Sequence, residues 1–205
     1  SDVVPELPFT YVKMLYDRMD IYPDLIIAIG GGSVIDLAKA ISVSSNYDNL
    51  VKNFNNSKVN LKKKCALMVV PSTFGTGSET SFGSILYNDL ENIKGGIRGE
   101  ELLPEKIILD YKIYKSANSK LMAEAGFDCL THAIETYLST KSNDFTRLNS
   151  INAINNIFSN LEKAVNKRER NNLIKMAVTS TLMGVNLAYS STCMPHRIQY
   201  IIGPM

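Results

Sequence analysis

The sequence has no tryptophan, only two histidines and only three cysteines among its 205 residues. Cys65, Cys129 and Cys193 lie far apart and form no Cys-x-x-Cys pair, and their odd number suits a reducing compartment better than a disulfide framework. We therefore expect a cytoplasmic protein. A strong charge of either sign is also lacking, since the formal net charge is +2, which argues against nucleic acid or a membrane surface as a partner.

Long apolar runs are missing as well. No uninterrupted apolar stretch reaches the length of a membrane span, and residues 1–5 have neither the basic segment nor the apolar core of a signal peptide. The composition that remains, 45% hydrophobic and 20% charged residues, is typical of a globular protein with a substantial core. The length allows one large domain or two small ones.

Apolar spacing divides the chain into two parts near residue 115. In the first part, short continuous apolar runs predict buried parallel strands, and helical patterns lie between them. The elements expected there are helices at 9–20 and 34–41, strands at 25–29, 65–70 and 106–110, a polar loop with at most a short helix at 43–64, and a hairpin at 84–94 appended to the sheet. The second part predicts only helices, at 119–139, 145–165 and 168–190. We expect an α/β domain at 1–115 and an all-helical domain at 116–205.

Gly30-Gly31-Gly32-Ser33 joins the first strand to a helix. Three glycines let the backbone turn sharply and approach a ligand, and the helix N-terminus offers unpaired N–H groups and positive dipole charge, so a phosphate would fit there. A tight structural turn would use the same glycines, and the loop matches neither G-x-G-x-x-G nor the P-loop pattern. Asp36, one turn into the helix, could reach a bound sugar or amide, or could be a solvated acid that favours the helix dipole.

A second loop, Pro71 to Glu79, ends the second strand in a similar way. It adds the hydroxyl groups of Ser72, Thr73, Thr76 and Ser78 to two glycines. Each loop alone could be an ordinary turn. Because the carboxyl ends of parallel strands meet at one edge of a sheet, both loops are expected to converge where open α/β sheets bind ligands.

Asp128 and His132 lie four residues apart in a predicted helix, which places both side chains on one face. A carboxylate oxygen and an imidazole nitrogen at that spacing can bind one divalent cation. Taken alone the pair is weak evidence, because an Asp near a helix N-terminus and a half-buried His are common structural features. Cys129 is turned about 100° away and is expected to pack in the core.

Three separate stretches together resemble, in order and approximate spacing, the signatures of the iron-containing (group III) alcohol dehydrogenases. They are residues 30–40, 71–79 and 126–135. The resemblance implies an α/β dinucleotide-binding domain followed by an all-helical domain, the dehydroquinate synthase-like fold, with the active site in the cleft between them. It also implies that both domains are incomplete here, because the family has another strand–helix segment before residue 1 and further helices after residue 205.

The resemblance assigns residues to two cofactors. For NAD or NADP they are Gly30, Gly31, Gly32 and Ser33 at the pyrophosphate, Asp36 near the nicotinamide ribose, Thr73, Thr76 and Ser78 in the second loop, and Lys94 after the hairpin. For the metal they are Asp128, His132 and His196, the last followed by a glycine seven positions on, with a fourth ligand expected beyond Met205. Asp and His ligands with an open position suit Fe²⁺ or Zn²⁺, and the resemblance favours Fe²⁺.

The implied activity is hydride transfer between a nicotinamide cofactor and a small alcohol or aldehyde. His196 and Tyr200 are the catalytic candidates, and Tyr200 stands where many family members have a second histidine implicated in proton transfer. A glycerol or glycerol-phosphate dehydrogenase, or a dehydroquinate synthase-like enzyme, would share these features. A non-catalytic nucleotide-binding protein or fragment is the alternative of another class. We expect the protein to act on a small molecule and to form a homodimer. We expect it to bind neither nucleic acid nor a membrane.

Overall fold

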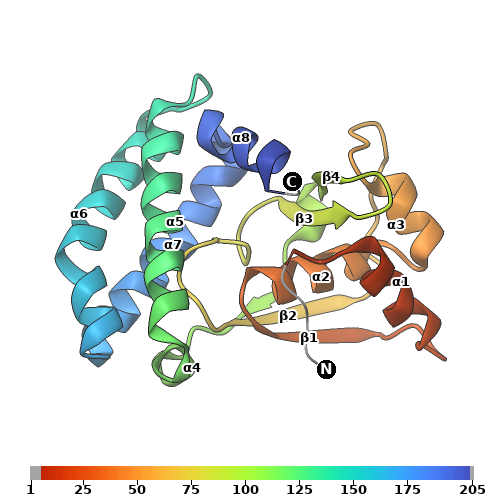
Figure 1. The fold of residues 1–205 in the computed structure, drawn as a ribbon, viewed down its shortest axis with the longest axis horizontal. Coiled ribbons are helices and arrows are strands. Elements are labelled where there is room, and N and C mark those ends of the chain that lie inside the picture. The colour runs from red at the N-terminus through yellow and green to blue at the C-terminus, as the bar shows by residue number, and fades with distance from the viewer. Residues whose placement is uncertain (1–5, 204–205) are drawn as a thin grey trace.

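In the computed structural model, which describes residues 6–203, an α/β part comes first along the chain and a helical part follows. The two parts lie side by side, with the strands on one side and the long helices on the other (Figure 1). This arrangement agrees with the predicted fold class. Residues 1–5, where we expect no targeting signal, lie outside the described residues, as do residues 204–205.

A three-stranded parallel sheet has the order β1-β2-β5, formed by β1 (Leu25–Gly30), β2 (Ala66–Pro71) and β5 (Lys106–Ile107). β1 and β2 pair over their full length, so the loops that follow them leave the sheet at the same edge, as predicted. The predicted strand at 106–110 is wrong in its second half. Only two residues pair with β2, and Asp110 already caps the next helix by accepting the Lys112 N–H at 2.9 Å.

The remaining elements of the α/β part surround this sheet. They are α1 (Phe9–Asp17), α2 (Gly32–Val43), α3 (Tyr47–Asn53), β3 (Gly83–Asn88), β4 (Ile93–Arg98) and the short 3₁₀ helix η1 (Glu100–Leu102). The hairpin β3–β4 forms a sheet of its own, so its predicted attachment to the parallel sheet is wrong. The reason is α2, which contacts both β1 and β3 and separates the two sheets (Figure 1).

The helical part consists of α4 (Tyr111–Ser116), α5 (Ser119–Leu138), α6 (Asp144–Asn166), α7 (Arg170–Ser190) and α8 (Met194–Ile202). Asn118 and Asn143 accept backbone N–H groups at the starts of α5 and α6, which explains where these helices begin. Buried Met122, Met176 and Cys129 belong to a core that the long helices share, as expected for Cys129. The helix core also takes in Tyr114, and the boundary near residue 115 stays a prediction.

One face of the parallel sheet is exposed. Side chains of β1 that point away from α2 have large exposed fractions, 48% at Leu25, 56% at Ile27 and 62% at Ile29. Parallel sheets are usually covered on both faces, and we expected β1 to be buried. Among the described residues, this face of β1 is instead left exposed. Between residues 6 and 203, no helix combines the length and apolar character that a membrane crossing requires.

Candidate metal and cofactor site

The helix α5 presents three polar side chains along one face. Asp128, His132 and Glu135 stand at positions i, i+4 and i+7, a spacing that repeats every two helical turns. His132 and Glu135 are buried, at 5% and 3% exposure. Polar groups at such depth require partners, which α8 and the loop after β2 supply.

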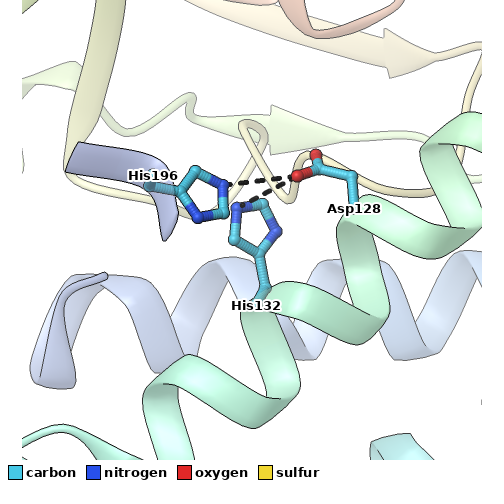
Figure 2. A group of neighbouring side chains, drawn as sticks. All are labelled: Asp128, His132 and His196. Carbon is cyan, nitrogen blue, oxygen red and sulfur yellow. Dashed lines mark ion pairs between the residues drawn. The ribbon is translucent and has the colours of Figure 1, made fainter. Parts of the chain in front are cut away.

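The helix α8 brings His196 to Asp128 and His132. The Asp128 Oδ1 atom lies 3.3 Å from His196 Nε2 and 3.7 Å from His132 Nε2, and the two imidazole rings stack with centroids 4.5 Å apart. Figure 2 shows the three side chains converging on one point. All three candidate ligand atoms lie within 4.8 Å of one another. The predicted set of Asp128, His132 and His196 is therefore brought together in space.

The second nitrogen of each imidazole has its own acceptor. His132 Nδ1 lies 3.1 Å from the Gly75 carbonyl oxygen, and His196 Nδ1 lies 2.7 Å from Glu135 Oε2. A carbonyl or carboxylate oxygen can only accept, so both Nδ1 atoms donate, and each Nε2 is left to face Asp128. Glu135 also accepts the backbone N–H of His196 at 3.2 Å, which fixes the first turn of α8.

Glu135 was not predicted as a site residue. Its signal in the sequence was its spacing, because it lies three residues after His132 and seven after Asp128 on the same helical face. A buried carboxylate that accepts from a ligating histidine is the usual outer partner of a metal site, where it orients the ring and raises its basicity.

Burial and mutual charge shift the pKa values of Asp128, His132 and His196. Burial lowers the pKa of His132, which Asp128 only partly opposes, so this imidazole is neutral near pH 7. Burial would raise the pKa of Asp128, but His132 and His196 outweigh it and hold that pKa below its ordinary value. Burial also lowers the pKa of His196, yet Asp128 and Glu135 more than offset this and the pKa lies above its usual value.

This donor set fits a divalent cation. A neutral His132 points its Nε2 lone pair at an ionised carboxylate, and two lone pairs face each other favourably only when a cation lies between them. Two imidazole nitrogens and one carboxylate oxygen are ligands that both Zn²⁺ and Fe²⁺ accept. The residues therefore match the metal that the resemblance implies, without deciding which ion it is.

A cavity of about 940 Å³ joins these ligands to the α/β part. Most predicted cofactor residues line it together with Asp128, His132 and His196. They are Gly32, Ser33, Asp36, Thr76, Ser78 and Lys94, and Tyr200 lines it as well. Gly30, Gly31 and Thr73 are not in its wall. Gly31 instead packs on Thr73, since a Cβ there would meet the Thr73 hydroxyl oxygen at 3.3 Å.

The glycine loop works through close approach and not through unusual backbone angles. Gly30 ends β1, Gly31 is the N-cap of α2 with φ −80°, and Gly32 begins the helix. A Cβ on Gly32 would lie 2.7 Å from the Thr76 methyl carbon, so only glycine lets α2 start this close to the second loop. Gly32 and Ser33, the first two residues of α2, line the cavity, and a helix N-terminus is a favourable site for an anion.

Asp36 is held by hydrogen bonds, so it is not the solvated acid that its place in the first turns of α2 would also allow. Its carboxylate accepts from the Ser78 hydroxyl and, at 3.1 Å, from the Ile85 N–H. Burial raises its pKa, which Lys39, Ser78 and Ile85 partly counteract. The side chain therefore has a fixed position in the cavity wall.

Lys94 and Tyr200 lie at the cavity in different ways. The Lys94 ammonium forms an ion pair with Glu6 at 2.8 Å, so a cofactor would compete with that carboxylate. Burial raises the pKa of Tyr200, and the charges of Asp36 and Asp128 add to this while Arg98 lowers it. The phenol thus lies within electrostatic reach of both the glycine-loop helix and the metal ligands.

The fold and this cavity define a class: a protein with a dinucleotide-type loop at a parallel sheet and a candidate metal site on the adjoining helices. Residues 1–111 match the family model described as iron-containing alcohol dehydrogenase, and residues 122–205 match the C-terminal part of the same family. The chain belongs to the iron-containing alcohol dehydrogenase family.

Relatives and solved structures agree with this membership. Long-chain-alcohol dehydrogenase 1 of Geobacillus thermodenitrificans is 34% identical over 208 residues, covering 99% of this chain and 52% of the relative. An iron-containing alcohol dehydrogenase from Thermotoga maritima superimposes with a TM-score of 0.86 at 31% identity, over 98% of this chain and 55% of that one. Sulfoacetaldehyde reductase from Bifidobacterium kashiwanohense, solved in complex with NAD+, superimposes with a TM-score of 0.89 at 25% identity. The superposition covers 100% of this chain and 56% of the reductase. The predicted fold class is confirmed, and the chain spans about half the length of these proteins.

Proposed function

We propose that this chain carries the nicotinamide-binding and metal-binding parts of an NAD(P)-dependent, metal-dependent alcohol dehydrogenase or aldehyde reductase. The observation that carries the proposal is the convergence of Asp128 Oδ1, His132 Nε2 and His196 Nε2 in the same cavity as the glycine-loop helix. The relatives are named alcohol dehydrogenases, and one solved structure, named a reductase, was determined with NAD+. These names favour neither the dehydroquinate synthase-like and glycerol dehydrogenase alternatives nor a non-catalytic protein.

In this proposal each residue has a defined task. Gly32 and Ser33 bind the cofactor pyrophosphate through backbone N–H groups, and Asp36 positions the ribose next to the nicotinamide. Asp128, His132 and His196 hold the divalent ion. When bound, the ion polarises the alcohol or carbonyl oxygen, and the nicotinamide takes or gives the hydride.

The protein also controls proton and ring positions. Gly75 and Glu135 keep the two imidazoles in the tautomer that directs Nε2 to the ion. Tyr200 stays protonated at neutral pH and can carry a proton between the substrate oxygen and solvent at its phenol oxygen. Gly30, Gly31 and Thr73 shape the loops from behind, while Thr76, Ser78 and Lys94 contact the cofactor.

Four finer points belong to the same proposal: the metal, the nucleotide, the location and the oligomeric state. The family name favours Fe²⁺ over Zn²⁺, and the nucleotide is NAD or NADP. A cytoplasmic location is supported by the three free cysteines. A homodimer stays a prediction that light scattering of the full-length protein would check.

The test uses the full-length protein purified without added chelator. We expect bound iron or zinc close to one equivalent by elemental analysis, and oxidation of NADH or NADPH with small aldehydes that a chelator stops and Fe²⁺ or Zn²⁺ restores. A full-length protein that binds no transition metal and oxidises neither nucleotide with any aldehyde would contradict the proposal.

A further inference from the structure

Lys39 is a buried cation that the mechanism above does not use. It lies on α2 one turn after Asp36, and its side chain is 0% exposed. The ammonium donates to three backbone carbonyls, those of Ser78 at 2.7 Å, Ser81 at 2.8 Å and Gly83. An ammonium has three N–H donors, so each donor has a carbonyl acceptor.

The three carbonyls belong to one segment, residues 78–83, which runs from the second predicted cofactor loop into β3. Ser78, Ser81 and Gly83 all line the cavity. Residues 78–82 precede β3, and Gly83 is the first residue of that strand. Lys39 therefore cross-links this part of the cavity wall to the glycine-loop helix at three points.

Asp36 accepts hydrogen bonds from Ser78, at the start of this segment, and from Ile85, two residues after its end. The Ser78 hydroxyl donates to one carboxylate oxygen, and the Ile85 N–H donates to the other at 3.1 Å. On the backbone of the same residue, the Ser84 hydroxyl donates to the Asp36 carbonyl at 2.7 Å. A shift of residues 78–83 would thus move the donors that set the Asp36 carboxylate.

Charge balance explains why a lysine is retained at this depth. Burial lowers the pKa of Lys39 to about 8, while the carboxylates of Asp36 and Glu79 raise it against that effect, so the ammonium dominates at pH 7. Glu79 is itself buried and accepts the Thr181 hydroxyl of α7 at 2.8 Å. Loss of the cation would leave three carbonyls without a donor and the carboxylates of Asp36 and Glu79 without a counter-charge.

We propose that Lys39 is a positioning residue for the cofactor: by holding residues 78–83 against α2, it sets the Asp36 carboxylate and the Ser78 hydroxyl towards the nicotinamide side of the cavity. This inference rests on the proposed function of the cavity. It assigns Lys39 no contact with the substrate or the cofactor. The metal ligands lie on α5 and α8, so the inference expects Lys39 to leave metal binding unchanged.

The experiment compares Lys39→Met with the exposed lysine variant Lys52→Met in the full-length, metal-loaded protein. NADH and NADPH binding is titrated by nucleotide fluorescence, and metal affinity is titrated separately. We expect Lys39→Met to raise the nucleotide Kd roughly tenfold or more, since binding must then order the loop, with KM for the cofactor rising more than kcat falls. The metal affinity of Lys39→Met should equal that of the wild type. Lys52→Met should equal the wild type in every measurement.

The possible outcomes distinguish the role of Lys39 from the proposed function of the protein. If Lys39→Met lowers the melting temperature but binds nucleotide as tightly as the wild type per folded molecule, Lys39 is only structural and the inference is overturned. If the wild type itself binds neither nucleotide, the proposed function fails and takes this inference with it. Should Lys39→Met not fold, Lys39→Gln is titrated in its place: it lacks the charge and has at most two N–H donors for three carbonyls, so a higher nucleotide Kd is expected and an unchanged Kd overturns the inference equally.

Discussion

The His132 imidazole lies 3.1 Å from the Gly75 carbonyl oxygen, and this hydrogen bond joins the helix of the candidate metal ligands to the second cofactor loop. The same glycine donates its N–H to the Ser180 hydroxyl of α7 at 2.7 Å. A Cβ on Gly75 would collide with the backbone of Ala125 on α5. The loop after β2 is therefore held directly against the helical part, and a nucleotide on the loop and an ion on α5 would share one rigid frame.

Replacement of His132 by Ala should abolish metal binding and turnover of the full-length protein. The change removes one of three candidate ligands and leaves the Gly75 carbonyl without its donor, which costs about 1–3 kcal/mol of stability without unfolding the chain. Metal content by elemental analysis and a melting curve measure the two effects. Ser159→Ala on the exposed side of α6 is the control. Full metal occupancy in His132→Ala would sink the assignment of this ligand.

Replacement of Glu135 by Gln should weaken metal binding while all three candidate ligands stay in place. The amide can still accept from His196 but no longer carries the charge that raises the basicity of the ring, and loss of such outer partners typically costs roughly 10- to 100-fold in metal affinity. Competition with a chromophoric chelator measures the affinity. Glu124→Gln changes an exposed carboxylate on the same helix and should have no effect. Equal affinities for the two variants would refute the role of Glu135.

Metal affinity should fall as the pH is lowered through neutrality, because the ion must displace a proton from His196 Nε2. Asp128 and Glu135 hold the pKa of His196 above its ordinary value of 6.5, so this competition reaches neutral pH. Calorimetric titrations at pH 7 in buffers of different ionisation enthalpy should show proton release on metal binding. No proton release at pH 7 would contradict a His196 pKa raised by Asp128 and Glu135.

The same protonation predicts opposite stability trends with and without metal. In metal-free protein, a group with a raised folded-state pKa contributes stability that is complete below pH 6.5, the unfolded value, and is lost as the pH rises through the folded-state pKa. Chelator-treated protein should therefore lose stability above pH 6.5 on account of His196, whereas metal-loaded protein should gain it. Melting temperatures of both forms between pH 6 and 8 test the divergence, and parallel curves would contradict it.

The sequence predicted best what depends on local pattern. Asp128 and His132 could be paired because helical spacing fixes their common face, and the loops after β1 and β2 could be brought together because parallel strands share an edge. Glu135 and Lys39 were missed because their roles arise from partners far along the chain, His196 and residues 78–83. Glu135 shares the helical face of Asp128 and His132, whereas a buried lysine such as Lys39 has no local signature that distinguishes it from an exposed one.

The errors have the same origin. The hairpin β3–β4 was assigned to the wrong sheet because an apolar pattern predicts that a strand is present but not which strand it pairs with. The helix α2 lies between the hairpin and the parallel sheet and prevents their pairing. The glycines of the first loop were expected to supply a sharp turn, yet Gly32 is required by the closeness of Thr76, a residue in another loop. Packing distances of this kind follow from the assembled structure.

Replacement of Gly184 by Ala should loosen the contact between α7 and the second loop. The added Cβ would meet the Gly77 carbonyl oxygen, which is backbone and cannot turn aside, and Gly77 itself has φ +59° and little freedom to accommodate the shift. We expect a loss of about 1–3 kcal/mol, as for other overpacked sites. The matched control is Gly83→Ala, whose Cβ would lie 3.8 Å from Arg98 Nη1, an ordinary contact. Urea unfolding of both variants measures the difference, and equal stabilities would show that the loop yields to α7 more easily than this packing implies.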